Sequence, residues 1–182
     1  MNRNILVAYA SKYGATKEIA EKIGEVLCQA GLQADVCQVD GILDITSYQA
    51  IILGSAIYIG KWQKEAVEFL RINEKILANR PVWIFSSGPT GEGDPVELVE
   101  GLRVPVALQP VVDRIHLRDI AVFHGHINRD KLNFIEKWAI KDLVKKPFGD
   151  FRDWDAITAW ATSIAETLKN TDAEQSALSS TR

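Results

Sequence analysis

The sequence predicts an α/β fold in which a doubly wound, five-stranded parallel sheet has the strand order 2-1-3-4-5. Three observations predict it. Five short apolar runs have the length of strands, segments of helical periodicity alternate with them, and turns rich in glycine and serine end three of the runs. Right-handed crossovers leave few topologies for such a chain, and the order 2-1-3-4-5 places its switch point between the first and third strands.

The expected strands are the runs at residues 5–10, 34–39, 50–56, 82–85 and 119–123. The first and third runs are apolar throughout, which suits central parallel strands that are covered on both faces. The run at 34–39 instead alternates between apolar and polar residues.

The expected helices fill the intervals between these runs. The first begins at Thr16 and carries one apolar face, made of Ile19, Ile23, Val26, Leu27 and Ala30. The second runs to Asn79, with Trp62, Ala66, Phe69 and Leu70 on one side. Prolines divide residues 92–118 into short helical pieces. A further helix is expected at 129–146, in a segment that a minimal sheet would not need. Asp153 is expected to cap a final helix, whose inward side carries Trp154, Ile157, Ala161, Ile164 and Leu168.

We expect one domain over residues 1–170 and a disordered tail over 171–182, where the chain is polar and aperiodic. Hydrophobic residues make up 47% of the 182 and the net charge is −3, the profile of a globular protein without the basic excess that nucleic-acid binding requires. Cys28 and Cys37 lack the spacing of a metal or redox site, and we expect two buried thiols in a reducing, cytoplasmic setting. No apolar stretch approaches the length of a membrane-spanning helix.

The turn after the first strand is suited to a phosphate. The first turn of a helix leaves backbone N–H groups unpaired at the positive end of the helix dipole. Gly14 lets the backbone approach closely, and Ser11 and Thr16 can add hydroxyl groups. The turn lacks the glycines of a dinucleotide site and the Gly-Lys-Ser/Thr of a triphosphate loop, so a compact monophosphate is the better match. The alternative is that Thr16 only caps the helix and Gly14 only turns the chain.

Three turns are expected to meet, because each follows a strand at the carboxyl edge of the sheet beside the switch point. The first comprises Ser11, Lys12, Tyr13, Gly14, Ala15 and Thr16, the second Ala56, Ile57, Tyr58, Ile59, Gly60 and Trp62, and the third Ser86, Ser87, Gly88, Pro89, Thr90 and Gly91. Tyr58 or Trp62 can stack on a flat ring, whose polar edge Ser87 and Gly88 can meet with N–H groups. The alternatives are that Trp62 is a core residue and Tyr58 an exposed loop residue.

These three turns resemble those of flavodoxins. In that family the hydroxyl-rich first turn holds the phosphate of FMN and the other two clasp its isoalloxazine ring, so the resemblance implies FMN as cofactor and all eighteen of these residues as its site. Tyr13 stands where a threonine is usual.

A narrower resemblance covers nearly the whole chain. The Ser-Ala-Ile-Tyr-Ile-Gly turn from Ser55, the segment at 125–152 and the Asp153-Trp154-Asp155 start of the last helix are similar to the menaquinone-dependent protoporphyrinogen dehydrogenase group. This resemblance implies an FMN-dependent oxidoreductase of heme biosynthesis that oxidises protoporphyrinogen IX or a similar organic substrate with a quinone as acceptor. No catalytic side chain or metal is needed beyond the flavin, although His124 and His126 could donate protons or be surface residues.

The predicted helix at 129–146 is apolar and edged with Lys141 and Lys145, so it could rest on a membrane surface at the inner face, or pack on the domain or a second subunit as a homodimer. Two other functions stay open. One is a flavodoxin-type electron carrier, against which the small net charge weighs because carriers are usually far more acidic. The other is a flavin-free α/β binding module, which Tyr13 keeps in view.

Overall fold

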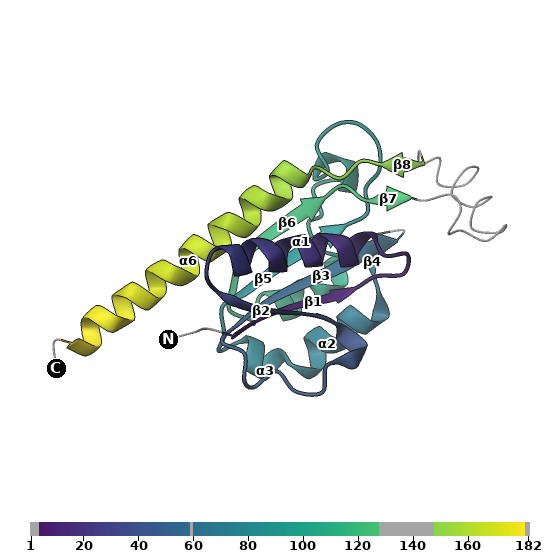
Figure 1. The fold of residues 1–182 in the computed structure, drawn as a ribbon. Coiled ribbons are helices and arrows are strands. Elements are labelled where there is room, and N and C mark those ends of the chain that lie inside the picture. The colour runs from purple at the N-terminus through teal and green to yellow at the C-terminus, as the bar shows by residue number, and fades with distance from the viewer. Residues whose placement is uncertain (1–3, 59, 128–147, 181–182) are drawn as a thin grey trace.

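The structure is a computed structural model that describes residues 4–58, 60–127 and 148–180. Its five parallel strands have the order β2-β1-β3-β5-β6, which is the predicted topology, with a short strand β4 paired to β3 (Figure 1). The strands are β1 (Asn4–Ala10), β2 (Gln33–Gln38), β3 (Ala50–Tyr58), β4 (Lys61–Trp62), β5 (Val82–Ser87) and β6 (Leu117–Phe123). A separate antiparallel pair joins β7 (His126–Ile127) to β8 (Gly149–Asp150).

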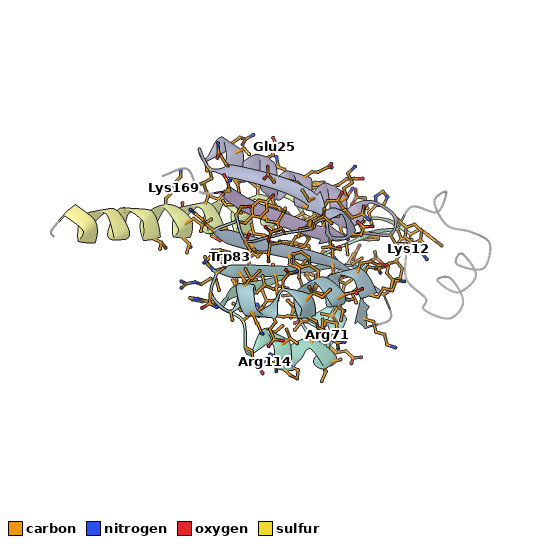
Figure 2. The ribbon with its side chains drawn as sticks, turned by 90° about the horizontal axis from the view of Figure 1, so that it is seen from below. Lys12, Glu25, Arg71, Trp83, Arg114 and Lys169 are labelled. Atoms are coloured by element: carbon orange, nitrogen blue, oxygen red, sulfur yellow. The ribbon has the colours of Figure 1, made fainter. Side chains whose placement is uncertain are left out.

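The helices cover both faces of the sheet. They are α1 (Ala15–Gln29), α2 (Lys64–Ile72), α3 (Glu74–Leu77), α4 (Gln109–Val112) and α6 (Trp154–Ser180), with short 3₁₀ helices η1 (Val39–Gly41), η2 (Glu97–Val99) and η3 (Val106–Leu108). Figure 1 shows α1 and α6 on one face and α2 and α3 on the other, and in Figure 2 Glu25 of α1 and Arg71 of α2 lie on opposite sides of the sheet.

Alternation along each strand divides the core into two layers. On β1, Ile5 and Val7 pack with Ile19 of α1 and Ile157 of α6, whereas Leu6 packs with the α2 and α3 layer. All five side chains are fully buried, and each burial of this kind stabilises the fold by about 1.5–3 kcal/mol.

Gly54 lies directly against an aromatic ring of the core. A Cβ at this position of β3 would overlap the ring of Phe85 on the neighbouring strand β5. The missing side chain therefore makes room for an aromatic residue that itself has no exposed surface.

Several expectations differ from the structure. Trp62 lies on β4, where it pairs with Ile57, and not on the following helix. That helix ends at Ile72, well before the expected Asn79; the side-chain amide of its C-cap, Asn73, donates to the Phe69 carbonyl at 2.9 Å, and α3 follows. The two cysteines were expected to be buried, but Cys28 is exposed on the outer side of α1 and Cys37 is half-buried.

The chain end also differs. α6 continues as a helix to Ser180, well into the range expected to be a tail. Its N-cap agrees with prediction, since Asp153 Oδ1 accepts the N–H of Ala156 at 2.9 Å. Ile157, Ala161, Ile164 and Leu168 face inward as expected, but Trp154 is exposed. The helix expected at 129–146 lies outside the described residues.

Candidate functional site

The first turn has a backbone shape that only glycine adopts readily. Gly14 precedes the first residue of α1 with φ 98°, in the left-handed region. Its N–H donates to Ser11 Oγ at 3.0 Å, and no side chain caps the helix. Thr16 is therefore not the cap that the alternative interpretation required. The first N–H groups of α1 have no partners within the helix and remain available to an anion.

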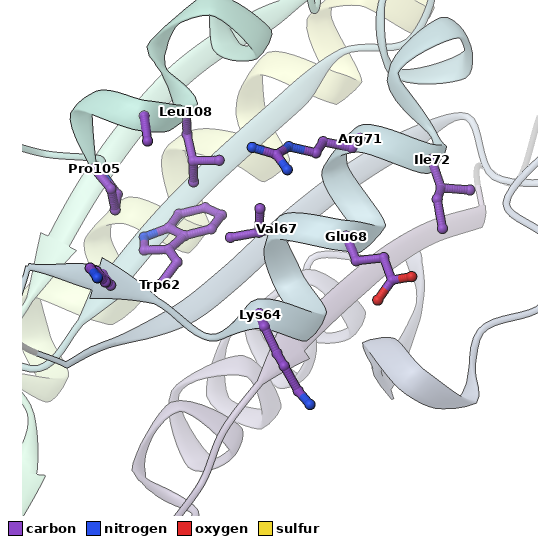
Figure 3. A pocket seen from close by; sticks show the side chains of 10 residues that line it. Trp62, Lys64, Val67, Glu68, Arg71, Ile72, Pro105 and Leu108 are labelled. Carbon is purple, nitrogen blue, oxygen red and sulfur yellow. The ribbon is translucent and has the colours of Figure 1, made fainter.

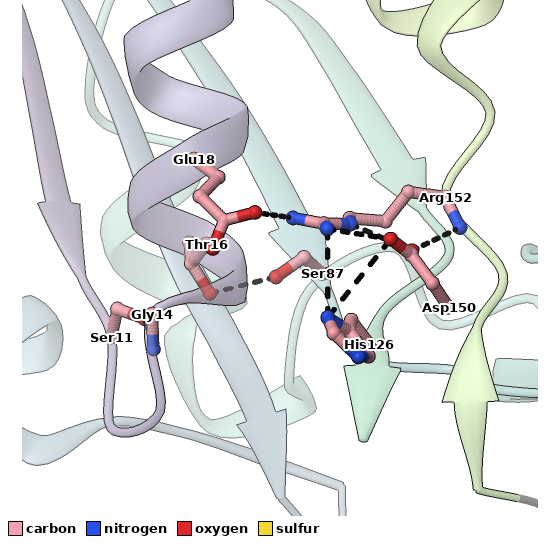
Figure 4. Close-up of polar contacts among 8 residues, drawn as sticks. All are labelled: Ser11, Gly14, Thr16, Glu18, Ser87, His126, Asp150 and Arg152. Atoms are coloured by element: carbon pink, nitrogen blue, oxygen red, sulfur yellow. Dashed lines mark hydrogen bonds and ion pairs between the residues drawn. The ribbon is translucent and has the colours of Figure 1, made fainter. Parts of the chain in front are cut away.

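A buried hydroxyl pair joins the first turn to the third. Thr16 Oγ1 and Ser87 Oγ lie 2.8 Å apart, and both residues are almost fully buried (Figure 4). Because 71 positions separate these residues, their contact depends on the order of the strands and not on local sequence. It brings the predicted phosphate turn against the end of β5.

An aromatic pair joins the first turn to the second. The rings of Tyr13 and Tyr58 meet edge to face with centroids 6.0 Å apart, and Lys12 Nζ lies 5.0 Å from the centroid of the Tyr13 ring. Tyr58 keeps 37% of its surface exposed. Tyr13 thus supports the side chain that was predicted to stack on a ring.

Trp62 occupies the core position that the sequence left open as an alternative. It is 5% exposed and packs in the α2 layer. Its indole N–H donates to Ser86 Oγ at 2.9 Å, and Ser86 Oγ donates in turn to the carbonyl of Arg103 at 2.8 Å. These bonds connect the β3–β4 hairpin to the end of β5 and to Arg103.

Two glycines allow the third turn to pack closely between the second turn and the segment after β6. A Cβ on Gly88 would lie 2.7 Å from the Ile57 carbonyl oxygen, and a Cβ on Gly125 would lie 2.9 Å from Gly88 Cα. The N–H of Gly125 donates to the Pro89 carbonyl at 2.9 Å. The second turn, the third turn and the segment after β6 are therefore in direct contact.

Thr90 has the one buried side-chain oxygen in the described part of the chain that lacks a hydrogen-bond partner. The residue is 6% exposed. An unpaired buried hydroxyl costs about 1–3 kcal/mol, so its persistence in the third turn is consistent with a partner that the chain itself does not supply.

The two histidines have different surroundings. His124 places Nδ1 3.3 Å from the Pro89 carbonyl and Nε2 3.0 Å from the Gly93 carbonyl. A neutral imidazole has one N–H and can donate to only one of these oxygens. His124 therefore holds the third turn in place. His126 lies on β7, beside Arg152 and Asp150 (Figure 4).

Sequence reasoning missed the group around Arg152. Its guanidinium donates to Glu18 of α1 at 2.6 Å and to both carboxylate oxygens of Asp150 at 2.8 and 2.6 Å, and it stacks on Trp154 at 4.6 Å. Its side chain is only 5% exposed. Hydrogen bonds from Arg152 hold the pKa of Asp150 below its ordinary value, against the opposing effect of burial.

The polar partners of Arg152 come from three elements: His126 from β7, Asp150 from β8 and Glu18 from the first turn of α1. The only local signal was the charged stretch before Asp153, which does not reveal a partner 134 positions away.

Among the described residues no group of three or more His, Cys, Asp or Glu side chains could hold a metal ion. None of the described helices is both long and apolar enough to cross a bilayer.

Comparisons with known proteins agree with this geometry. A family model described as "Flavodoxin domain" matches residues 6–153. Protoporphyrinogen IX dehydrogenase [quinone] of Escherichia coli K12 is 23% identical over 180 residues, covering 88% of this chain and 93% of that protein.

Solved structures share the fold. A flavodoxin from the domain Archaea has a TM-score of 0.59 at 15% identity, and Flavodoxin 2 from Bacillus cereus has a TM-score of 0.58 at 22% identity. Each likeness covers 91% of this chain and 99% of the other. The chain belongs to the flavodoxin domain family, whose fold binds FMN.

Proposed function

We propose that this protein is an FMN oxidoreductase that oxidises protoporphyrinogen IX, or a similar organic substrate, and passes the electrons to a quinone. The observation that carries the proposal is the meeting of three turns at one edge of the sheet, through the Thr16–Ser87 hydroxyl pair and the Tyr13–Tyr58 ring pair. The printed name of the Escherichia coli relative supports the choice of substrate and acceptor.

The phosphate of FMN would be held by the first turn. Gly14 exposes the backbone at the positive end of α1, and Lys12 adds a cation on the same turn. Thr16 and Ser87 form a buried floor that keeps the turn in register with β5. A phosphate dianion needs such donors to replace its water, because an apolar turn would offer it no hydrogen bonds and an acidic turn would repel it.

The ring would lie between the second and third turns. Tyr58 offers an exposed aromatic face, backbone groups of the turn at Ser87 and Gly88 can meet polar ring atoms, and the Thr90 hydroxyl is a buried donor still lacking a partner. When bound, the flavin supplies the electron-transfer chemistry, while the chain orients it and sets its surroundings. His124 and His126 stay proposed proton donors, and the bonds of His124 to the third turn favour His126 of the two.

The proposal is tested in two steps. The purified protein should show a flavin absorption spectrum, and acid should release FMN and not FAD. Anaerobic mixing with protoporphyrinogen IX should then bleach the flavin, and a soluble naphthoquinone should restore its colour. A colourless protein that ignores added FMN would refute the cofactor assignment and leave the flavin-free binding module. A flavin that protoporphyrinogen cannot reduce would refute the substrate.

A second candidate, the electron carrier, is favoured by the flavodoxins among the solved relatives. A carrier would exchange single electrons with a reductase but would not turn over porphyrinogen, so the same anaerobic assay separates the two.

Peripheral membrane contact and a homodimer are further parts of the proposal. The residues at 129–146 on which the membrane contact was predicted lie outside the described part of the chain. Sedimentation with anionic vesicles and light scattering of the free protein test these two statements separately.

A further inference from the structure

A hollow of about 560 Å³ lies on the α2 face of the sheet (Figure 3). Its walls come from β4, α2 and the segment around η3, and its main residues are Lys61, Trp62, Val67, Arg71, Pro105 and Leu108. Of these, only Trp62 belongs to the eighteen residues of the predicted FMN site. The hollow is large enough for a bicyclic organic molecule.

The floor of the hollow is apolar. Trp62 is 5% exposed and already uses its indole N–H on Ser86, so it presents carbon atoms to any occupant. In Figure 3 Pro105 and Val67 lie on the two sides of the indole, and Leu108 lies above it. Such walls favour a flat apolar body, because burying it removes apolar surface from water.

The charge on the rim is mostly positive. Lys61, Lys64 and Arg71 line the hollow against one carboxylate, Glu68. Figure 3 shows the Arg71 guanidinium reaching across toward Leu108, above the Trp62 indole, whereas Lys64 and Glu68 point away.

The Arg71 side chain makes no ion pair or hydrogen bond with another residue in the described part of the chain, and neither does Lys61. Lys64 instead has Glu65 within 3.9 Å. The guanidinium aimed into the hollow is therefore available to a ligand.

We propose that this hollow binds a small organic carboxylate with a flat apolar body. The body lies against Trp62, Val67 and Leu108, and the carboxylate accepts two parallel N–H bonds from Arg71, whose fork-shaped donor group matches it. Lys61, which also lines the hollow, adds long-range attraction. The site shares only Trp62 with the three turns that are proposed to form the FMN cradle, and it does not depend on the proposed reaction.

The test compares two ligands of nearly equal shape, 2-naphthoate and its neutral amide, by calorimetric titration of the purified, FMN-loaded protein. We expect the carboxylate to bind at least about fivefold more tightly than the amide. Arg71→Gln should abolish that preference by weakening the carboxylate alone, and Val67→Glu should weaken both ligands. Lys75→Gln removes one positive charge from α3, outside the hollow, and serves as the matched control with unchanged binding.

Four results would overturn the proposal. Three come from the FMN-loaded protein: no binding of 2-naphthoate, equal affinity for acid and amide, or equal loss in the Arg71 and Lys75 variants. The last result would mean that net charge alone attracts the ligand. Repeating the titration on flavin-stripped protein separates this site from the cradle, since binding should persist there; binding that disappears with the flavin would place the naphthoate at the cradle and overturn the assignment.

Discussion

The unpaired hydroxyl of Thr90 predicts a substitution that strengthens the fold and weakens cofactor binding at once. Valine has nearly the shape of threonine and replaces the hydroxyl by a methyl group. Thr90 Oγ1 is buried without a partner, and a buried unpaired polar group costs about 1–3 kcal/mol. Thr90→Val should therefore stabilise the flavin-free protein by about 1 kcal/mol, which raises Tm by about 2–4 °C for a chain of this size.

The same substitution should weaken FMN binding, because it removes the hydrogen bond that we propose between Thr90 and the ring in a buried setting. A net loss of about 0.5–1.5 kcal/mol corresponds to a rise in Kd of about two- to thirteenfold. Thermal unfolding of the flavin-free protein and quenching of FMN fluorescence measure the two effects. Thr167→Val on α6, where the hydroxyl donates to the Ser163 carbonyl at 2.8 Å, is the matched control and should change neither quantity much. A Thr90→Val protein with lower Tm, or with unchanged Kd for FMN, would refute the reasoning.

Three further substitutions have defined outcomes. Gly14→Val places a β-branched residue at φ 98° and adds bulk to the phosphate turn, so the Kd for FMN in fluorescence titration should rise at least about tenfold; an unchanged Kd would contradict the turn's assignment. Gly54→Ala drives a Cβ into the Phe85 ring and should lower the free energy of unfolding in urea by about 1–3 kcal/mol, unlike an alanine at the open Gly41. Arg152→Gln should lower the free energy of unfolding at neutral pH. Asp150 has a folded-state pKa below its ordinary 3.8, so the stability it adds is present above that value and is lost as pH falls through the folded pKa. The difference in the free energy of unfolding between Arg152→Gln and the unmodified protein should therefore become smaller in acid. A difference that does not change with pH would mean that the ion pair with Asp150 is not what stabilises the fold.

The order of the sheet could be predicted because parallel strands buried on both faces leave continuous apolar runs, as at Ile5 and Ile51. The β3–β4 hairpin could not. Trp62 and Ala66 are four positions apart, which is helical spacing, and both are buried in one layer. What identifies Trp62 as a strand residue is its pairing with Ile57 across the hairpin. Such pairing is a contact made in the folded chain, and the spacing of apolar residues does not reveal it.

The meeting of the three turns was predictable for the same reason, since strand order decides which turns lie together. The detailed contacts between them were not. Thr16 could have been a cap on sequence grounds, and its actual partner, Ser87, lies on another strand. Tyr13 stands where a threonine is usual, and the sequence alone does not show that its ring packs against Tyr58. Each of these distinctions depends on a side chain brought near by the fold.

Arg152 connects the segment between β6 and α6 to α1, the helix beside the proposed FMN cradle. Strands β7 and β8 both lie in this segment, and each contributes a side chain to the Arg152 group. The third contribution, Glu18, comes from the first turn of α1, two residues beyond Thr16. A guanidinium that is 5% exposed loses much of its hydration, which only well-placed carboxylates offset. The ends of this segment are thus held against the helix whose N-terminus is proposed to bind phosphate. If Arg152 positions the cradle in this way, Glu18→Gln should raise the Kd for FMN even though Glu18 is not one of the proposed FMN contacts.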